Sequence, residues 1–248
     1  MDLYLQMANR IAQSRYVVAL TGAGISVESG IPDFRSKGGL WSRYDPSEYA
    51  NIAAFRANPG KVWKMLMEMD ELLSAALPNP AHIVLAELER RGLLKAIITQ
   101  NVDSLHQRAG SVSVIEFHGH FRSLRCDGCG KRIQKEEALP GKLPPLCACS
   151  GPFRPEIVFF GETIPPNAYQ EAMKAAQSCD LMMIVGTSAT VAPASVLPPL
   201  AKNGGAYLLE INPTATGLSH RMSDCHIAES AGRTLPAILA ALDGAKAP

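Results

Sequence analysis

The sequence predicts a doubly wound α/β domain, a parallel sheet with helices on both faces, with a smaller domain inserted into it. Three observations lead to this prediction. Several short segments are mostly apolar at odd and even positions alike, which is typical of strands buried on both faces of a parallel sheet. Segments with helical periodicity separate these strands, as in doubly wound folds. Two longer stretches break the alternation, and one of them contains four of the six cysteines.

The predicted elements begin with a helix and a strand. Leu3, Met7 and Ile11 recur at helical spacing, and the apolar, partly β-branched segment 16–20 follows as the first strand. Further segments with the composition of buried strands are 94–99, 112–117, 181–186 and 206–211.

The clearest helix signal between these strands lies at 79–92. Asn79 is a favourable N-cap, Pro80 suits the first helical position, and Gly92 is a typical stop. The apolar face of this helix is predicted to consist of Ile83, Leu85 and Leu88.

The two stretches that break the alternation are predicted to be insertions that pack together as a small domain. The first, 36–78, has helical patterns without strand signals, and the second, 121–153, carries the clustered cysteines. The large domain then comprises 1–35, 79–120 and 154–248. A cleft beside a parallel sheet, between two domains, is a natural place for a ligand.

Composition and charge indicate a soluble globular protein. Hydrophobic residues make up 47% and charged residues 19%, and the formal net charge is +1. A chain so close to neutral has no field that would hold nucleic acid, so we expect no nucleic-acid partner. The sequence has no signal-peptide pattern and no apolar run of about 20 residues, so we expect no membrane partner and a cytoplasmic location. In that reducing compartment, clustered cysteines indicate metal binding rather than disulfides.

A glycine-rich turn directly follows the first predicted strand. Gly22 and Gly24 allow a tight turn and a close approach of backbone amides to a diphosphate. Val27 stands where the usual dinucleotide fingerprint has a third glycine, and no acidic residue ends a second strand about twenty residues on. An ordinary dehydrogenase is therefore disfavoured, and a turn built of small residues for packing alone is an alternative.

Three polar clusters lie near the ends of predicted strands. Asp33, Phe34 and Arg35 lie on a loop beside the glycine-rich turn, and the others occupy 99–106 and 116–120. Parallel sheets bind ligands at the carboxyl ends of their strands, so the clusters indicate a binding site.

The clustered cysteines have the spacing of a zinc ribbon. Cys126 and Cys129 form one pair, Cys147 and Cys149 form a second pair, and 17 residues separate the two. Four thiolates close a tetrahedral site, so the predicted zinc is structural rather than catalytic. The second pair is tighter than the common two-residue gap, and buried free thiols are the alternative.

The motifs together resemble the sirtuin family, in the short form of bacteria and archaea. The matching blocks are GAGISVESGIPDFR at 22–35, TQNVDSLHQRAG at 99–110, FHGH at 117–120, RPEIVFFGE at 154–162, GTSATVAPA at 186–194 and EIN at 210–212. The blocks stand in the family's order and span nearly the whole chain. The resemblance implies a Rossmann-like NAD-binding domain with a zinc-ribbon and helical small domain.

The resemblance also implies which residues contact NAD. Those against the diphosphate are Gly22, Ala23, Gly24 and Ser26, and those of the following cofactor-binding loop are Asp33, Phe34 and Arg35. Those that hold the nicotinamide ribose or line the nicotinamide pocket are Ala23, Ile31, Gln100, Asn101, Val102 and Asp103. Those that hold the adenosine half are Gly186, Thr187, Ser188, Asn212 and Ala231.

The chemistry that the resemblance implies needs a general base, and His118 is the candidate. When cationic nicotinamide leaves the ribose, an acyl amide oxygen can attack the opposite face, and a ribose hydroxyl must then lose its proton. A neutral histidine, with an ordinary pKa of about 6.5, suits that task. His82 has the position of a structural helix residue, whereas His106 and His120 yield to His118 only through the resemblance.

The resemblance further implies a groove for an extended substrate peptide. The residues assigned to it are Val158, Phe160, Gly161, Glu162 and Val191. The peptide would add as a strand, held by main-chain hydrogen bonds with little sequence preference. The same apolar stretches could also be core. Val158, Phe160, Phe34 and His118 would line the tunnel for the acyl-lysine stem.

The predicted function is an NAD-dependent protein lysine deacetylase, with acylated lysine side chains of proteins as partners. Two alternatives share parts of the site: a protein ADP-ribosyltransferase on the same scaffold, and a noncatalytic NAD-sensing module.

Family members that prefer acidic acyl groups resemble one another in a Tyr and an Arg three residues apart on a small-domain helix. The corresponding stretch here, 62–69, has no such pair but contains Trp63, Leu66 and three methionines. We therefore expect an apolar wall suited to acetyl groups.

Overall fold

The larger of two sheets contains six parallel strands. The computed structural model describes residues 2–33, 39, 42–139 and 141–244. Its strands are β1 (Val17–Thr21), β2 (Leu94–Thr99), β3 (Val114–Glu116), β7 (Leu181–Val185), β8 (Tyr207–Ile211) and β9 (Cys225–Ile227), in the order β3-β2-β1-β7-β8-β9. The winding reverses at β1, which has β2 on one side and β7 on the other. A crevice outside the carboxyl ends of these strands is where such sheets bind ligands.

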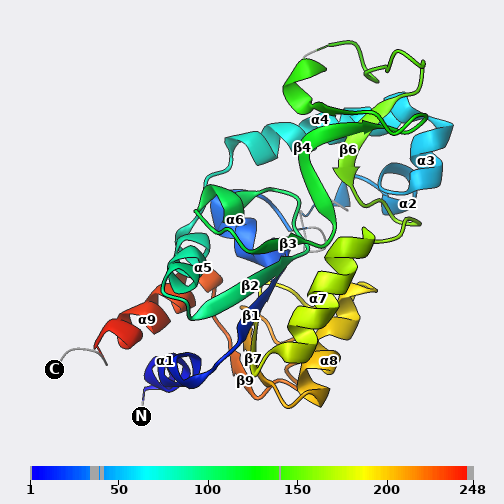
Figure 1. Ribbon diagram of the computed structural model, residues 1–248. Coiled ribbons are helices and arrows are strands. Elements are labelled where there is room, and N and C mark those ends of the chain that lie inside the picture. Colours follow the sequence, from blue (N-terminus) through cyan, green and yellow to red (C-terminus); the bar gives the residue numbers. More distant parts are fainter. Residues whose placement is uncertain (1, 34–38, 40–41, 140, 245–248) are drawn as a thin grey trace.

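Helices cover both faces of this sheet (Figure 1). One face packs against α1 (Leu3–Gln13), α5 (Pro80–Arg90) and α9 (Ala231–Gly244), and the other against α7 (Pro166–Ser178) and α8 (Leu197–Asn203). Val17 and Ala19 of β1 join the first core, whereas Val18 and Leu20 join the second, so successive side chains are buried on opposite faces. None of the helices in the described ranges is long and apolar enough to cross a membrane.

A second, antiparallel sheet and three helices form the small domain. The sheet has the order β5-β4-β6, with strands β4 (Gly119–Cys126), β5 (Arg132–Gln134) and β6 (Phe153–Ile157). The helices α2 (Pro46–Tyr49), α3 (Ile52–Ala57) and α4 (Pro59–Ala75) lie beside it (Figure 1). Trp63 of α4 is fully buried, and its Nε1 donates a hydrogen bond of 2.8 Å to the carbonyl of Phe153. This bond ties the helical insertion to the sheet.

The remaining elements are short and lie in loops. They are the helix α6 (Leu105–Arg108) and the 3-10 helices η1 (Ala23–Ser29), η3 (Lys135–Glu137) and η4 (Ala194–Val196).

The predicted α/β class is confirmed, with differences in detail. β2 has the predicted bounds, whereas β3 begins two residues late because Val112 is 88% exposed. The prediction for Ile83 is wrong, since it is 55% exposed while its neighbours His82 and Val84 are buried. The three-residue strand β9 was not predicted, because two of its residues are only partly buried and it is too short for a pattern.

We propose that the two sheets mark two domains, divided along the chain at the predicted boundaries. Strands β4 and β6 straddle two of these boundaries, since Gly119 and His120 belong to β4 and residues 154–157 belong to β6. The small sheet therefore continues directly from the large domain at both ends of the cysteine-bearing insertion.

Candidate active site

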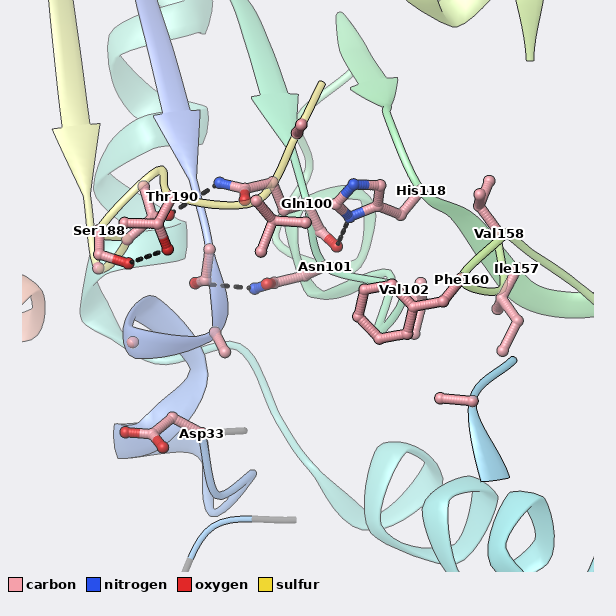
Figure 2. A pocket seen from close by; sticks show the side chains of 18 of the residues that line it. Asp33, Gln100, Asn101, Val102, His118, Ile157, Val158, Phe160, Ser188 and Thr190 are labelled. Carbon is pink, nitrogen blue, oxygen red and sulfur yellow. Dashed lines mark hydrogen bonds between the residues drawn. The ribbon is translucent and has the colours of Figure 1, made fainter. Parts of the chain in front are cut away.

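A cavity of about 600 Å³ lies where the carboxyl ends of β1, β2, β7 and β8 face the small domain (Figure 2). Loops that follow these strands line it, together with the loop after β6 and two side chains of α4. The predicted site residues in its lining are Gly22, Ala23, Gly24, Asp33, Gln100, Asn101, Val102, His118, Val158, Phe160, Gly161, Glu162, Gly186, Thr187, Ser188, Val191 and Asn212.

Six residues predicted to contact NAD lie elsewhere or fall outside the described residues. Ser26, Ile31 and Asp103 line a smaller pocket that adjoins the cavity and shares Ala23, Asn101 and Val102 with it. Ala231 is buried at the start of α9 and is not part of the lining, so its contact with adenosine remains a prediction. Phe34 and Arg35 lie outside the described residues.

The glycines of the first turn permit a close contact between the ends of β1 and β7. The amide of Gly24 donates a hydrogen bond of 2.9 Å to the carbonyl of Gly186. A Cβ atom on Gly22 would lie 2.7 Å from the Thr187 Cβ, and one on Gly24 would lie 2.8 Å from the Gly186 Cα. Gly186 itself has a φ of +61°. The close packing thus requires glycine at these positions. Because glycine has no side chain, the turn borders the cavity with its backbone there.

A buried polar network lines the smaller pocket. Asn101 Nδ2 donates hydrogen bonds of 3.1 Å to the carbonyl of Gly22 and to Ser26 Oγ. Ser26 Oγ in turn donates to Asp103 at 2.7 Å, and the amide of Leu105 donates to the same carboxylate at 2.9 Å. Burial raises the pKa of Asp103, and these two hydrogen bonds oppose the rise. These bonds hold the three polar side chains in fixed positions beside the pocket.

His118 faces the cavity with one ring nitrogen already occupied (Figure 2). Its Nδ1 lies 3.0 Å from the carbonyl oxygen of Gln100, which can only accept, so Nδ1 carries the proton and Nε2 is the basic nitrogen. Burial lowers the pKa of His118, and the bond to Gln100 partly opposes this. The His118 carbonyl accepts a 2.9 Å hydrogen bond from the amide of Val158. A neutral base is therefore held beside the predicted peptide groove.

The three histidines weighed against His118 are absent from the cavity lining. His82 and His106 are buried with ring centroids 4.9 Å apart, and His106 Nε2 lies 2.9 Å from Thr21 Oγ1. Burial lowers the pKa of His82 to about 4 and that of His106 to about 3, so both are neutral structural groups. His120 lies two residues beyond His118 on β4 and outside the lining.

The four clustered cysteines come together as predicted. Their Sγ atoms all lie within 4.8 Å of one another. Cys126 and Cys149 are 3.5 Å apart, and Cys129 and Cys147 are 3.7 Å apart. A tetrahedral zinc with Zn–S bonds of about 2.3 Å places its sulfurs about 3.8 Å apart, so the set fits zinc. The tight second pair contributes both of its thiols.

Phe160 of the predicted groove is held by backbone pairing with the helical insertion. The amide of Phe160 donates to the carbonyl of Ala50 at 2.8 Å, and the amide of Ile52 donates to the carbonyl of Phe160 at 3.0 Å. Val158 and Val191 line the cavity from different loops. The side chain of Phe160 stays half exposed at the edge of the cavity.

Helix α4 contributes apolar side chains to the cavity as predicted, but not all of the residues named for this wall line it. Met65 and Met69 of α4 line the cavity, whereas Trp63 and Leu66 do not, although all four side chains belong to the buried core of the small domain.

Other lining residues were not assigned a role from the sequence, although several stand within the matching blocks 154–162 and 186–194. They are Ala50, Ile157, Phe159, Ile164, Thr190, Ala192, Pro193, Thr214, Ala215, Thr216 and Gly217. Most lie in loops that border a predicted residue, so the loops were found although these members were not.

Comparison with known proteins agrees with this geometry. A profile described as "Sir2 family" matches residues 22–193. The chain is 49% identical over 217 residues to NAD-dependent protein deacylase 1 of Archaeoglobus fulgidus, covering 86% of this chain and 88% of that protein.

Solved structures share the whole fold. A Sir2 homologue in complex with NAD has a TM-score of 0.89 at 45% identity, covering 97% of this chain and 94% of that one. A Sir2 variant with a deacetylated p53 peptide and 3′-O-acetyl ADP-ribose has a TM-score of 0.90 at 36% identity, covering 95% and 96%. The chain belongs to the Sir2 family, the sirtuins.

Proposed function

We propose that this chain is an NAD-dependent protein lysine deacylase, with acetyl-lysine as its main substrate. The observation that carries the proposal is His118, whose free Nε2 belongs to a cavity shared by the glycine turn and the loop after β6. The relatives named as NAD-dependent deacylases and the Sir2 structures with NAD, deacetylated peptide and acetylated ADP-ribose support the same activity.

The residues that line the cavity and the smaller pocket support a placement in which each receives a different part of NAD. Gly22, Ala23 and Gly24 would face the diphosphate, and the loops after β7 and β8 would hold the adenosine half. The polar network of Asn101, Ser26 and Asp103 would receive the nicotinamide carboxamide, which has one donor group and one acceptor. NAD supplies an electrophilic ribose carbon once nicotinamide departs.

The protein's own groups would position the acyl-lysine and deprotonate a ribose hydroxyl. Val158 and Val191 would flank the lysine stem and direct its acyl oxygen toward the ribose. Nε2 of His118 would then accept the proton of a ribose hydroxyl, which frees that hydroxyl to attack the acyl carbon. The Gln100 carbonyl keeps the required tautomer through this step. Zinc, held by four thiolates outside the cavity, would stabilise the small domain and take no part in the chemistry.

The proposal is tested by incubating the protein with NAD and either an acetylated peptide or its unmodified form. We expect nicotinamide release that depends on the acetyl group, with one deacetylated peptide for each nicotinamide. Equal nicotinamide release with the unmodified peptide would contradict the proposal, because it would show that the acyl oxygen is not the nucleophile.

Acetyl-lysine should be processed much better than succinyl-lysine. Met65 and Met69 present an apolar, adaptable wall to the cavity, and no arginine is among the residues that line it in the described ranges. A succinyl carboxylate would therefore lose water without gaining a bidentate partner. We expect kcat/KM to be at least about tenfold lower for succinyl than for acetyl, equivalent to about 1.4 kcal/mol.

The measurement compares kcat/KM on one peptide that carries acetyl, butyryl or succinyl at the same lysine. Butyryl is the control for size, because it is longer than acetyl but uncharged, and it should stay close to acetyl. Succinyl in first place would show that the apolar wall does not determine acyl preference.

A further inference from the structure

Arg154 is a fully buried arginine that the proposed chemistry does not use. Its side chain is 1% exposed, and it stands on β6, outside the cavity lining. Burying a guanidinium is costly unless charged and polar partners compensate for the lost water. The identity of those partners indicates what the residue holds in place.

Three of these partners belong to residues 157–162, the last residue of β6 and the loop that follows it, which we call the substrate loop. Arg154 Nη1 donates a 3.2 Å hydrogen bond to the carbonyl of Ile157, and Nη2 donates to the carboxylate of Glu162. The guanidinium also lies over the ring of Phe159, 5.2 Å from its centroid. Start, middle and end of the substrate loop therefore converge on one planar cation.

Glu162 completes this arrangement from the other end of the loop. One carboxylate oxygen accepts from Arg154, and the other accepts a 3.1 Å hydrogen bond from the amide of Phe159. Arg125 lies at 3.9 Å from the same carboxylate, at the outer limit of an ion pair. The side chain of Glu162 is thus engaged within the protein, and it shapes the loop rather than offering both oxygens to a ligand.

The fourth partner lies between two of the clustered cysteines. Arg154 Nε is 3.5 Å from Oδ1 of Asp127, which stands between Cys126 and Cys129 in the chain. Asp127 also accepts two hydrogen bonds from Arg56, one from Nε at 2.9 Å and one from Nη2 at 3.3 Å. Arg56 is 60% exposed and gives its hydrogen bonds to the cysteine turn, and toward the substrate loop it has only a charge interaction with Glu162.

Every residue of the substrate loop, from Ile157 to Glu162, lines the cavity. Its backbone also fixes the candidate base, because the amide of Val158 donates to the carbonyl of His118. A change in the shape of this loop would therefore alter the acyl-lysine groove, while the glycine turn and the loops after β7 and β8 belong to separate segments.

We propose that Arg154 is a positioning residue for the acyl-lysine substrate, acting through Glu162 on the substrate loop and anchored to the cysteine turn by Asp127. The proposal rests on the proposed function, because it takes the groove beside the substrate loop as the acyl-lysine site. Arg154 does not touch the substrate. It sets the affinity for acylated peptide and leaves the binding of ADP-ribose to the other loops.

The test uses the zinc-loaded full chain with Arg154→Met, Arg154→Lys and Glu162→Gln, and with Arg56→Met as the matched control. Arg56→Met removes an arginine from the same aspartate and breaks no hydrogen bond of the substrate loop, although it removes a positive charge that acts on Glu162. For each variant the measurements are the Kd for an acetyl-lysine peptide, the Kd for ADP-ribose, the KM for the peptide and the zinc content.

We expect Arg154→Met to weaken peptide binding by about tenfold or more, with the Kd for ADP-ribose within about twofold and zinc retained. Arg154→Lys should recover only part of the loss, because an ammonium lacks the planar fork that reaches Glu162 and Ile157 together. Arg56→Met should match the unmodified protein in all four measurements.

A parallel loss of peptide binding, ADP-ribose binding and zinc in Arg154→Met would show a general structural role and overturn the proposal. Unchanged peptide binding in folded Arg154→Met would overturn it as well. If Arg154→Met fails to fold, Glu162→Gln decides: selective loss of peptide affinity supports the proposal, and unchanged affinity refutes it. In the double variant Arg154→Met/Glu162→Gln the two effects should be less than additive, and full additivity would contradict action through Glu162.

Failure of the proposed function gives a different result. In that case the unmodified protein itself would neither bind the acetylated peptide in preference to its unmodified form nor turn it over. The variants are therefore compared only if the unmodified protein binds the acetylated peptide in preference to its unmodified form and turns it over.

Discussion

Replacing His118 with alanine should abolish deacylation and leave NAD binding and the fold largely intact. The side chain lines the cavity with a free Nε2, while its neighbours Gln100 and Val158 are held mainly by backbone bonds that alanine would keep. Removal of a general base costs about 10²–10⁴-fold in rate. The effect should appear in kcat under saturating NAD and peptide, with the Kd for ADP-ribose unchanged.

The matched control is His120→Ala, two residues further along the chain on β4 and outside the cavity lining. It should keep the activity of the unmodified protein to within a few-fold. Near-normal turnover in the His118 variant, or an equal loss in the His120 variant, would remove His118 from the catalytic role.

The same assignment has a consequence for pH. A base must be neutral to accept a proton, and burial lowers the pKa of His118 from its ordinary value. Activity should therefore be lost as the pH falls through a pKa below about 6.5, and the acid limb should lie lower than for a solvated histidine. This limb should be absent from the residual activity of the His118→Ala variant.

Removal of zinc should have the second large effect. The purified protein should carry one zinc per chain, because four thiols already lie within 4.8 Å of one another. Without the metal the two cysteine pairs are joined by backbone hydrogen bonds such as that from the amide of Asp127 to the carbonyl of Pro152, and small modules of this kind depend on zinc for folding. We expect Cys126→Ala, or treatment with a strong chelator, to unfold the small domain and so to eliminate deacylation.

Cys225→Ala serves as the control, since Cys225 lies on β9, outside the cluster. It should retain both zinc and activity. Fully active protein without zinc would refute a structural metal, and complete zinc retention in a Cys149→Ala variant would exclude Cys149 as a ligand.

The sequence predicted those parts of the site whose positions depend on where the parallel strands end. β1, β2 and β7 are apolar on both faces, which identifies them as central parallel strands, and their carboxyl ends must then meet. The residues that follow them, such as Gly22 and Asn101, accordingly line the cavity or the pocket beside it.

The parts that the sequence could not predict depend on how a helix is turned. Helix α4 is apolar on two sides, because one side enters the small-domain core and the other borders the cavity. Trp63 and Met65 are both apolar, and only the packing of α4 against β6 decides which of them borders the cavity. Arg154 is similar: an arginine beside a proline on a short strand gives no sign that three groups of one loop converge on it.

The most direct test of lysine deacylation is to identify where the acetyl group and the ADP-ribose go. The protein is incubated with NAD and an acetylated peptide, and all products are separated and weighed by mass spectrometry. The account predicts equimolar nicotinamide, deacetylated peptide and ADP-ribose that carries the acetyl group. ADP-ribose attached to the peptide or to the protein, with the acetyl group still on lysine, would contradict it and would identify a protein ADP-ribosyltransferase instead.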